Sequence, residues 1–406
     1  MQGTKGLETD TNQLICRKNM LLSKGFEVEM YTGTAQGDIV GFSDMIVAAL
    51  DRFVQEPDSR NVEYTTLPFY QYEQLLSELV RPRLQLRKYL KRLGDYTIVP
   101  GSTLSMGNSK SFYRSDSSNP YHTYIENTYG TNVVTTSIHI NIGISDPELL
   151  MRAYRLIRVE APLYLALSAS SPFLDNYVTG YHSTRWKIFP TTPPHVPLFE
   201  SHAHFIHWTE AQLANGRMQN VRHLWISVRP NGDCRPYNLN RLELRICDLI
   251  VDPIALLAVT ALLEARLWQL IDDPSLDPLE RSVFPETTRS EDLIALTNAN
   301  EVAVACQSLE AELRHWEDGR SILARNWIEE IYQEVWPIAK KKSFGFFISP
   351  IQKILKEGNE AQRWLKLHKQ GLDSRSVIVQ AIQNMAQQEI ELEEKINYPS
   401  LLSMDD

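Results

Sequence analysis

Residues 24–31 read Lys-Gly-Phe-Glu-Val-Glu-Met-Tyr, and this stretch decides how the chain folds. A β-strand points successive side chains to opposite faces, so the apolar residues at 26, 28 and 30 are predicted to face a core, while Glu27, Glu29 and Tyr31 share the other face. The two carboxylates then stand roughly 7 Å apart. Hard divalent cations such as Mg²⁺ bind oxygen ligands of this kind together with phosphate oxygens. The alternative is an exposed strand whose glutamates meet only water.

The same alternation recurs in later segments of the chain. Residues 61–66 place Glu63 on one face of a strand, and residues 133–143 place His139 and Asn141 opposite a row of isoleucines. If such a polar strand face is buried, its side chains need hydrogen-bond partners or a ligand, although a lone histidine is more often a structural residue. Residues 241–248 turn every second residue away from the core, namely Arg241, Glu243, Arg245 and Cys247. Arginines beside a glutamate pair a cation ligand with groups that neutralise phosphate charge.

Two further polar segments are candidates for binding sites. Residues 179–186 form a loop in which Arg185 lies among hydroxyl side chains, a setting that suits a carboxylate or phosphate; the alternative is a surface arginine stacked on Trp186. His202, His204 and His207 have a tempting spacing, but no carboxylate or cysteine completes a metal geometry, so no metal site is inferred there.

The chain divides into a mixed first part and a helical last part. Helical spacing predicts helices over 42–54, 72–93 and 147–168, and buried strands are predicted over 96–100 and 224–229. From residue 254 the pattern is helical, over 254–270, 301–335, 348–368 and 376–396, with a basic aromatic link at 340–346. We therefore predict a sheet with flanking helices over residues 1–253 and a helical region over residues 254–406.

Composition bounds the class of protein. The 406 residues carry a formal net charge of -9 and are 43% hydrophobic, which is typical of a globular protein and argues against a nucleic-acid partner. Apolar runs break within about 10 residues, whereas a membrane span needs about 20, and no leader opens the chain. We expect a soluble cytoplasmic protein without a membrane partner. Its cysteines are expected to be reduced thiols, namely Cys16, Cys234, Cys247 and Cys306.

Several carboxylates on one sheet face create an electrostatic problem. Like charges held close together in a low dielectric repel one another, and bound divalent metals resolve that conflict. Two or three Mg²⁺ ions with ATP phosphates, and arginines at the rim, would form a phosphoryl-transfer site. The observations thus favour a metal-dependent, ATP-using enzyme.

Five motifs stand in a fixed order along the first 60% of the chain. They are Gly25-Phe26-Glu27-Val28-Glu29, Val62-Glu63-Tyr64-Thr65-Thr66, His139-Ile140-Asn141-Ile142-Gly143, Ser183-Thr184-Arg185 and Arg241-Leu242-Glu243-Leu244-Arg245. This set resembles the motifs of the glutamate–cysteine ligase and carboxylate–amine ligase family, within the glutamine synthetase-like superfamily. The resemblance implies an α+β fold: a curved antiparallel sheet forming a funnel-shaped active site, with helices on its outer face and a helical C-terminal third.

The resemblance also implies roles for single residues. Arg245 resembles the arginine that stabilises the transferred phosphoryl group, and Arg185 the one that grips a substrate carboxylate. Asn141, with Arg245 and Arg241, is implied in binding nucleotide or phosphate. The implied Mg²⁺ ligands are Glu27, Glu29, Glu63, His139 and Glu243. One departure is Thr128-Tyr129-Gly130, where some members carry Arg-Tyr-Gly. Because this arginine is missing, the sequence does not indicate which cation binds one of the substrate carboxylates.

The activity implied is ATP-dependent joining of the γ-carboxylate of L-glutamate to the amine of L-cysteine through γ-glutamyl phosphate, the first step of glutathione biosynthesis. The small-molecule substrates would be glutamate, cysteine and ATP. Two alternatives stay open: a ligase that joins glutamate to another amine, and a non-catalytic ATP-binding regulatory protein on the same fold. The sequence does not indicate an oligomeric state.

Overall fold

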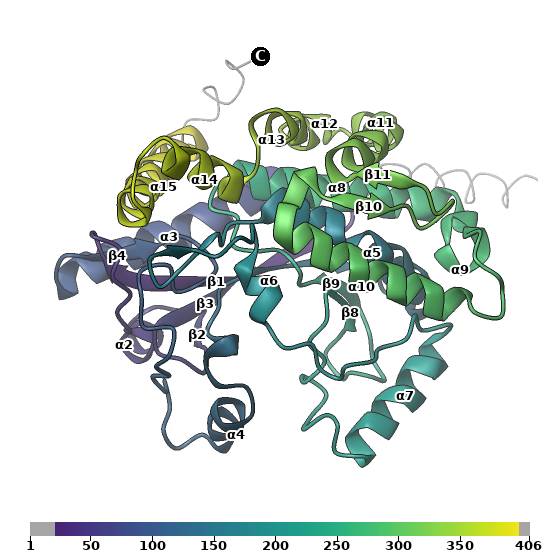
Figure 1. The fold of residues 1–406 in the computed structure, drawn as a ribbon, viewed down its shortest axis with the longest axis horizontal. Helices are drawn as coiled ribbons and strands as arrows, with labels where there is room; N and C mark the ends of the chain where they lie inside the picture. Colours follow the sequence, from purple (N-terminus) through teal and green to yellow (C-terminus); the bar gives the residue numbers. More distant parts are fainter. Residues whose placement is uncertain (1–20, 398–406) are drawn as a thin grey trace, which may run out of the picture.

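The computed structural model describes residues 21–397 and contains one large antiparallel sheet. Cys16 and most of the segment before the first strand lie outside the described residues. The strand order is β2-β3-β1-β5-β9-β8, and β4 pairs with the far end of β1. The predicted antiparallel sheet is confirmed (Figure 1). Its strands are β1 (Lys24–Thr34), β2 (Phe53–Gln55), β3 (Asn61–Thr65), β4 (Tyr96–Val99), β5 (Ile138–Gly143), β8 (Val228–Asn231) and β9 (Arg241–Leu244).

The central strand β1 follows the predicted alternation. Phe26, Val28 and Met30 are at most 2% exposed and belong to the main hydrophobic core. Tyr31 keeps to this alternation, since it lies outside that core, but it is fully buried in a smaller cluster that includes Ile378 of the C-terminal helix. Its hydroxyl donates a hydrogen bond of 2.7 Å to the carbonyl of residue 134.

Three long helices cover the core face of the sheet: α3 (Tyr72–Leu93), α5 (Pro147–Ser168) and α8 (Pro253–Asp272). Asp146 and Asp252 cap α5 and α8 ahead of a proline, and α3 ends at Gly94, so the predicted bounds of α3 and α5 are confirmed. Figure 1 shows these helices on one side of the sheet, with α4 and α7 on the other. Within residues 21–397, α8 is the one helix apolar and long enough to span a membrane; 72% of that window is buried inside the protein.

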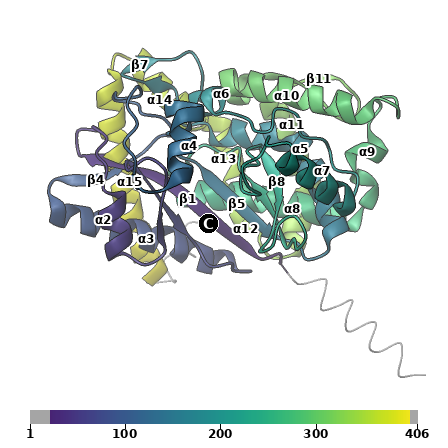
Figure 2. The same cartoon turned by 90° about the horizontal axis from the view of Figure 1, so that it is seen from below.

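The helical C-terminal third lies on the outer side of these helices in Figure 1, and Figure 2, seen from below, shows α15 at one end of the molecule and α10 and α11 at the other. The continuous helix predicted over 301–335 is wrong, because the chain turns at Ser308, where φ is +46°, and forms a hairpin before the next helix. Gly358 likewise divides the predicted helix over 348–368. The elements are α10 (Arg289–Gln307), η3 (Ser308–Glu310), β10 (Glu312–Arg314), β11 (Ser321–Leu323), α11 (Ala324–Lys341), α12 (Gly345–Ile348), α13 (Ile351–Glu357), α14 (Glu360–Lys369) and α15 (Ser374–Asn397).

The helix predicted over 42–54 is too long. It is α2 (Ser43–Ala49), after which the chain turns at Arg52, where φ is +70°, and residues 53–55 become strand β2. Apolar residues at helical spacing hid this short strand, because three residues are too few to show an alternation. The turn matters because it carries Glu56 to the polar side of the sheet.

The outward orientation predicted for Cys247 is also wrong. The amides of Arg245 and Ile246 both donate to the carbonyl of Ser227, at 2.8 and 3.2 Å, which is a β-bulge. The extra residue shifts the alternation, and Cys247 is therefore fully buried in the core. The strand predicted over 224–229 begins later, at Val228.

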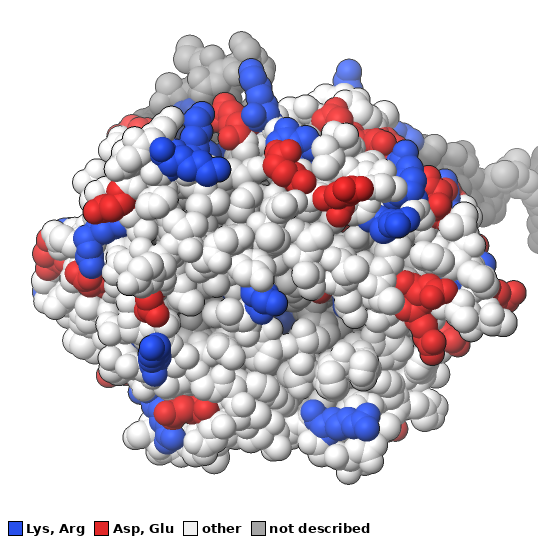
Figure 3. All heavy atoms as spheres, in the orientation of Figure 1, with Lys and Arg blue, Asp and Glu red and all other residues white. Residues whose placement is uncertain are grey.

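Shorter elements complete the polar side and the edges of the molecule. In Figure 3, which has the orientation of Figure 1, acidic and basic side chains are interspersed over the side of the molecule in view, and this side is hollowed near its centre. The remaining elements are α4 (Pro120–Tyr129), η1 (Gly130–Val133), β6 (Phe173–Leu174), β7 (Tyr177–Val178), α6 (Thr184–Ile188), α7 (His202–Ala214), η2 (Pro274–Leu276) and α9 (Pro278–Arg281).

Candidate functional site

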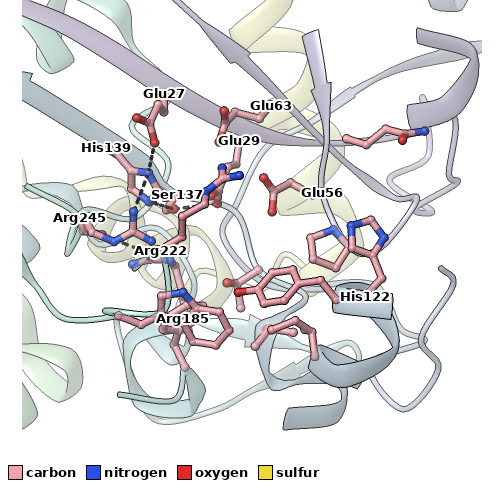
Figure 4. A pocket seen from close by; sticks show the side chains of 18 of the residues that line it. Glu27, Glu29, Glu56, Glu63, His122, Ser137, His139, Arg185, Arg222 and Arg245 are labelled. Carbon is pink, nitrogen blue, oxygen red and sulfur yellow. Dashed lines mark hydrogen bonds and ion pairs between the residues drawn. The ribbon is translucent and has the colours of Figure 1, made fainter. Parts of the chain in front are cut away.

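The polar side of the sheet brings together acidic residues from three strands. Glu27 lies directly opposite His139 across β1 and β5, and Glu29 lies directly opposite Glu63 across β1 and β3. Facing residues in antiparallel strands have Cβ atoms about 5 Å apart, so strand register alone assembles these four side chains. Figure 4 shows them side by side at one wall of a cavity.

The cavity has a volume of about 350 Å³ and lies over this part of the sheet. Its walls come from segments far apart in the chain: the turn after β2, helices α4 and α6, and the loop before β8. Besides the strand residues, these segments contribute Glu56, Tyr121, His122, Arg185, Phe189, Arg222 and Trp225.

Two carboxylates in the cavity have no neutralising partner in the described part of the chain. Among the described residues, the carboxylates of Glu63 and Glu56 have neither a hydrogen bond nor an ion pair. Burial, together with Glu56, Glu27 and Glu29, raises the pKa of Glu63 well above its usual value. Burial and the charge of Glu29 raise the pKa of Glu56 to about 8. Carboxylates crowded in this way are destabilised until a cation enters, so the site has the electrostatics of a cation-binding site.

His139 stands at the centre of the carboxylates. Its Nδ1 lies 2.8 Å from Oε2 of Glu27, and its Nε2 lies 3.8 Å from Oε1 of Glu29. Ser137 donates a hydrogen bond of 2.7 Å to Glu29 and is 3.1 Å from Nε2 of the histidine. Two sets of possible ligand atoms lie within 4.8 Å of one another: Glu27, His139 and Glu243, and Glu29, Glu63 and His139. The donor set is mostly carboxylate oxygen, which fits Mg²⁺.

Glu243 differs from the other glutamates because it is already paired. Arg229 holds it through two bonds of 2.6 and 3.1 Å, Asn231 donates at 2.6 Å, and Arg245 donates at 2.5 Å. Although burial opposes ionisation, Arg229 and Arg245 hold the pKa of Glu243 well below its usual range. Its Oε1 is still 3.6 Å from Nδ1 of His139, so it faces the cluster, and its role as a metal ligand stays a prediction.

Arg185 lines the cavity from helix α6 rather than from a loop. The alternative of a surface arginine is wrong, because its side chain is only 3% exposed. Its guanidinium donates to the carbonyls of Ile246 and Arg245 at 3.0 and 3.1 Å and lies 3.8 Å from Asp248. Its buried Nε has no hydrogen-bond partner within residues 21–397. The side chain is therefore held rigidly beside the cavity with one donor left over.

Two predicted residues lie in a neighbouring cavity instead. Asn141 and Arg241 line a second cavity of about 530 Å³, which shares Glu27 with the first. Arg241 Nε donates to Asn141 at 3.2 Å, and Asn141 in turn reaches Glu27 at 3.4 Å. Two of the three predicted nucleotide contacts, Asn141 and Arg241, thus lie together at one side of the carboxylates, whereas the third, Arg245, lines the first cavity with Arg185.

Sequence reasoning missed several residues of the first cavity. Ser137 is two residues before His139, so the alternation already placed it on the polar face. Arg229 lies directly opposite Glu243 in the sheet, a pairing that no sequence pattern reveals. Glu56 and Arg222 come from loops and carried no periodic signal. The histidines at 202, 204 and 207 lie on α7, outside both ligand sets found in the described chain.

Comparison with known proteins agrees with the motifs. The family described as glutamate-cysteine ligase family 2 (GCS2) matches residues 23–390. A protein named "Putative glutamate--cysteine ligase 2" from Solibacter usitatus is 27% identical over 246 residues, which are 59% of this chain and 60% of that protein. A protein of the same name from Sorangium cellulosum is 28% identical over 236 residues, 57% of this chain and 58% of its own. The chain thus spans about three fifths of these relatives.

Two solved structures share the fold. A bifunctional glutathione synthetase from Pasteurella multocida superposes with a TM-score of 0.73 and 15% identity over 95% of this chain and 55% of that chain. A glutamate–cysteine ligase from Francisella tularensis, in complex with AMP, gives a TM-score of 0.71 and 14% identity over 95% of both chains. The predicted fold class is thereby confirmed. With the family matched over nearly its whole length, the chain belongs to glutamate–cysteine ligase family 2.

Proposed function

We propose that the protein is an ATP-dependent carboxylate–amine ligase that joins the γ-carboxylate of L-glutamate to the amine of L-cysteine. The observation that carries the proposal is the crowding of unneutralised carboxylates at a cavity whose other wall holds arginines. Such a site suits divalent cations and phosphate together. Family membership and the five motifs support the same reaction class.

The chemistry follows from the low reactivity of a carboxylate toward amines. One oxygen of the γ-carboxylate attacks the γ-phosphorus of ATP, the bond to ADP breaks, and γ-glutamyl phosphate forms. The amine nitrogen then attacks the acyl carbon, loses a proton to solvent, and the carbon–oxygen bond to phosphate breaks. No protein nucleophile is required, so the protein contributes placement and charge stabilisation.

The cation site would be formed by residues of the sheet and its first turn. Glu27, Glu29, Glu63 and His139 would hold two or three Mg²⁺ ions, and we add Glu56, which the sequence did not suggest. When bound, Mg²⁺ neutralises charge on the transferred phosphoryl group. Glu27, Glu29, Glu63 and His139 are already oriented by strand register, which limits the reorganisation on binding.

Arginines and the second cavity would place the substrates. Arg245, beside His139 and Glu243, would stabilise the phosphoryl group in transfer, and the free Nε of Arg185 would donate to a substrate carboxylate. The nucleotide would occupy the second cavity against Asn141 and Arg241, because that cavity meets the first at Glu27 and so directs the phosphates toward the carboxylates.

The test is ADP release and product mass with purified protein, MgCl₂, ATP, L-glutamate and L-cysteine. Glu29→Gln and Glu63→Gln should each lower kcat about 100-fold or more, since each removes an oxygen ligand from the cluster. Glu286→Gln, at an exposed position away from both cavities, is the matched control. Full turnover by the two cluster variants would exclude the proposed cation site.

A different amine is the second candidate. The cavity wall beside the carboxylates is aromatic, with Trp225, Phe189 and Tyr121, and these side chains do not select a thiol over another small side chain. A panel of amines in the same assay separates the two candidates by product mass. ATP binding without release of ADP for any amine would instead favour a regulatory protein.

A further inference from the structure

The geometry points to Arg222 as the residue that binds the α-carboxylate of an amino-acid substrate; this inference rests on the proposed ligase function and names how that site selects amino acids. Arg222 lies in the loop before β8 and lines the first cavity, and Figure 4 shows its side chain extending into that space. Carboxylate recognition by a guanidinium uses two parallel charge-assisted hydrogen bonds.

Arg222 is an exposed residue whose charge acts on Glu56 and Tyr121 through space and not through a hydrogen bond. Of the arginines that line the first cavity, Arg229 and Arg245 hold Glu243, while Arg185 is bound to two backbone carbonyls. Within residues 21–397, the Arg222 guanidinium has no hydrogen bond and no carboxylate within ion-pair distance. It is therefore the cavity cation that remains available to an anionic ligand.

The backbone of Arg222 is nevertheless fixed. Its amide donates to Asn220 at 2.8 Å, and its carbonyl accepts a bond of 3.1 Å from the Arg229 side chain, which is itself paired with Glu243. The next residue, His223, is 2.7 Å from the hydroxyl of Tyr129 through its Nε2. Arg222 thus presents a free guanidinium on an anchored main chain, which lowers the entropic cost of binding.

The surroundings favour an amino-acid carboxylate over a phosphate. Arg222 acts electrostatically on the phenol of Tyr121 and shares its wall with Trp225, whereas the second cavity holds the predicted nucleotide contacts. Thr128, where some family members carry arginine, precedes Tyr129, whose hydroxyl contacts the histidine beside Arg222. The loop before β8 thus supplies a cation close to the position that lacks one.

The test compares binding and turnover of full-length wild-type protein, Arg222→Gln, Arg222→Lys and the control Arg217→Gln, an exposed arginine of the same loop that does not line the cavity. Binding of L-glutamate and L-cysteine is measured by calorimetry with MgCl₂ and a non-hydrolysable ATP analogue. Cysteamine and 4-aminobutyrate, which lack the α-carboxylates of cysteine and glutamate, are the paired probes.

We expect Arg222→Gln to lower the affinity for one of the two amino acids about 10- to 100-fold and to leave the affinity for its decarboxylated analogue unchanged. Arg222→Lys should have an intermediate affinity. Loss confined to cysteine or to glutamate identifies whose carboxylate is bound. The inference would be overturned if wild type and Arg222→Gln preferred each amino acid over its decarboxylated analogue to the same extent. It would also be overturned if only the affinity for the ATP analogue changed, or if the wild type bound neither amino acid. Absence of ADP release despite that discrimination would overturn the proposed function only.

Discussion

At the scale of single residues, Glu56 and Glu63 are held in a protonation state that depends on whether a cation is present. Burial and neighbouring carboxylates raise the pKa of both groups, that of Glu56 to about 8, while an unfolded chain ionises such groups near pH 4.5. The folded metal-free protein therefore binds more protons than the unfolded chain between these values. The stability that these protons confer is complete below about pH 4.5 and is lost as pH rises toward 8.

Without metal, the free energy of unfolding should fall by about 1–3 kcal/mol between pH 5.5 and 8.5, less than the full shift implies because solvent in the cavity screens the charges. Urea titrations in EDTA measure this difference. Glu56→Gln should flatten the dependence and MgCl₂ should reduce it, whereas the exposed control Glu286→Gln should leave it unchanged. A free energy that rises over this range would refute the account of the two carboxylates.

Glu243 should stabilise the fold in its ionised form, unlike Glu56 and Glu63, because it is buried and paired with two arginines. Glu243→Gln leaves the charges of Arg229 and Arg245 without their counter-ion and should cost about 3–5 kcal/mol of folding free energy. Arg241→Gln, at a side chain that is 31% exposed, should cost less than about 1 kcal/mol. Urea unfolding in EDTA compares them, and equal midpoints would show that the Glu243 pairs do not stabilise the fold.

The sequence predicted the carboxylates and the histidine that strands bring to the cavity, and it missed Glu56 and Arg222, which loops bring there. Glu27, Glu29, Glu63 and His139 were found because a period of two fixes the face of a strand residue, whatever its distant partners are. Glu56 was missed because its orientation depends on the turn at Arg52, which a helical reading of the segment concealed. Loop residues carry no period, so only the packed structure places them.

At the scale of elements, β1 is tied to the helical layer by a buried charge network. The ammonium of Lys24 lies 2.7 Å from Glu264 of α8, and both side chains are fully buried. The hydroxyl of Tyr72 also donates to this carboxylate at 2.6 Å, and the amide of Leu22 donates at 2.7 Å. The network fixes where β1, which carries two of the cluster glutamates, sits on α8.

Removing either Lys24 or Glu264 alone should lower the free energy of unfolding more than removing both charges together. Lys24→Met and Glu264→Gln should each cost about 3–5 kcal/mol, because each leaves the other charge buried alone. The double variant keeps an oxygen acceptor for Tyr72 without a charge, so it should be more stable than either single variant. A double-mutant cycle by urea unfolding measures the coupling. Additive losses would mean that the two charges do not interact.

Element prediction failed where tertiary structure outweighed local pattern. Long helices with an acidic cap and a proline at the start, namely α5 and α8, were predicted to within two residues at each end. The hairpin between α10 and α11 was read as helix, although its buried Trp316 bonds Glu160 of α5 at 3.0 Å. The bulge at Ser227 is another such case, since an inserted residue changes the face of Cys247 without changing composition.

At the scale of the whole molecule, one continuous hydrophobic core contains residues from both sides of the predicted boundary between residues 253 and 254. A single hydrophobic cluster contains Val28 of β1, Leu156 of α5, Leu262 of α8 and Trp327 of α11. The last helix, α15, packs on α3, and its buried Glu389 pairs with Arg87 at 2.5 Å. The helical part therefore completes the core beneath the carboxylates of the sheet.

A fragment of residues 1–253 should not fold on its own. Without α8, the core faces of α3 and α5 would be exposed to water, and at about 25 cal/mol per Å² the lost burial exceeds the net stability of a domain. We expect the full chain to unfold in one cooperative transition by near- and far-ultraviolet circular dichroism, and the fragment to lack near-ultraviolet signal. Adding residues 254–406 as a separate chain should restore that signal. A cooperative transition of the isolated fragment would instead establish residues 1–253 as a domain that folds by itself.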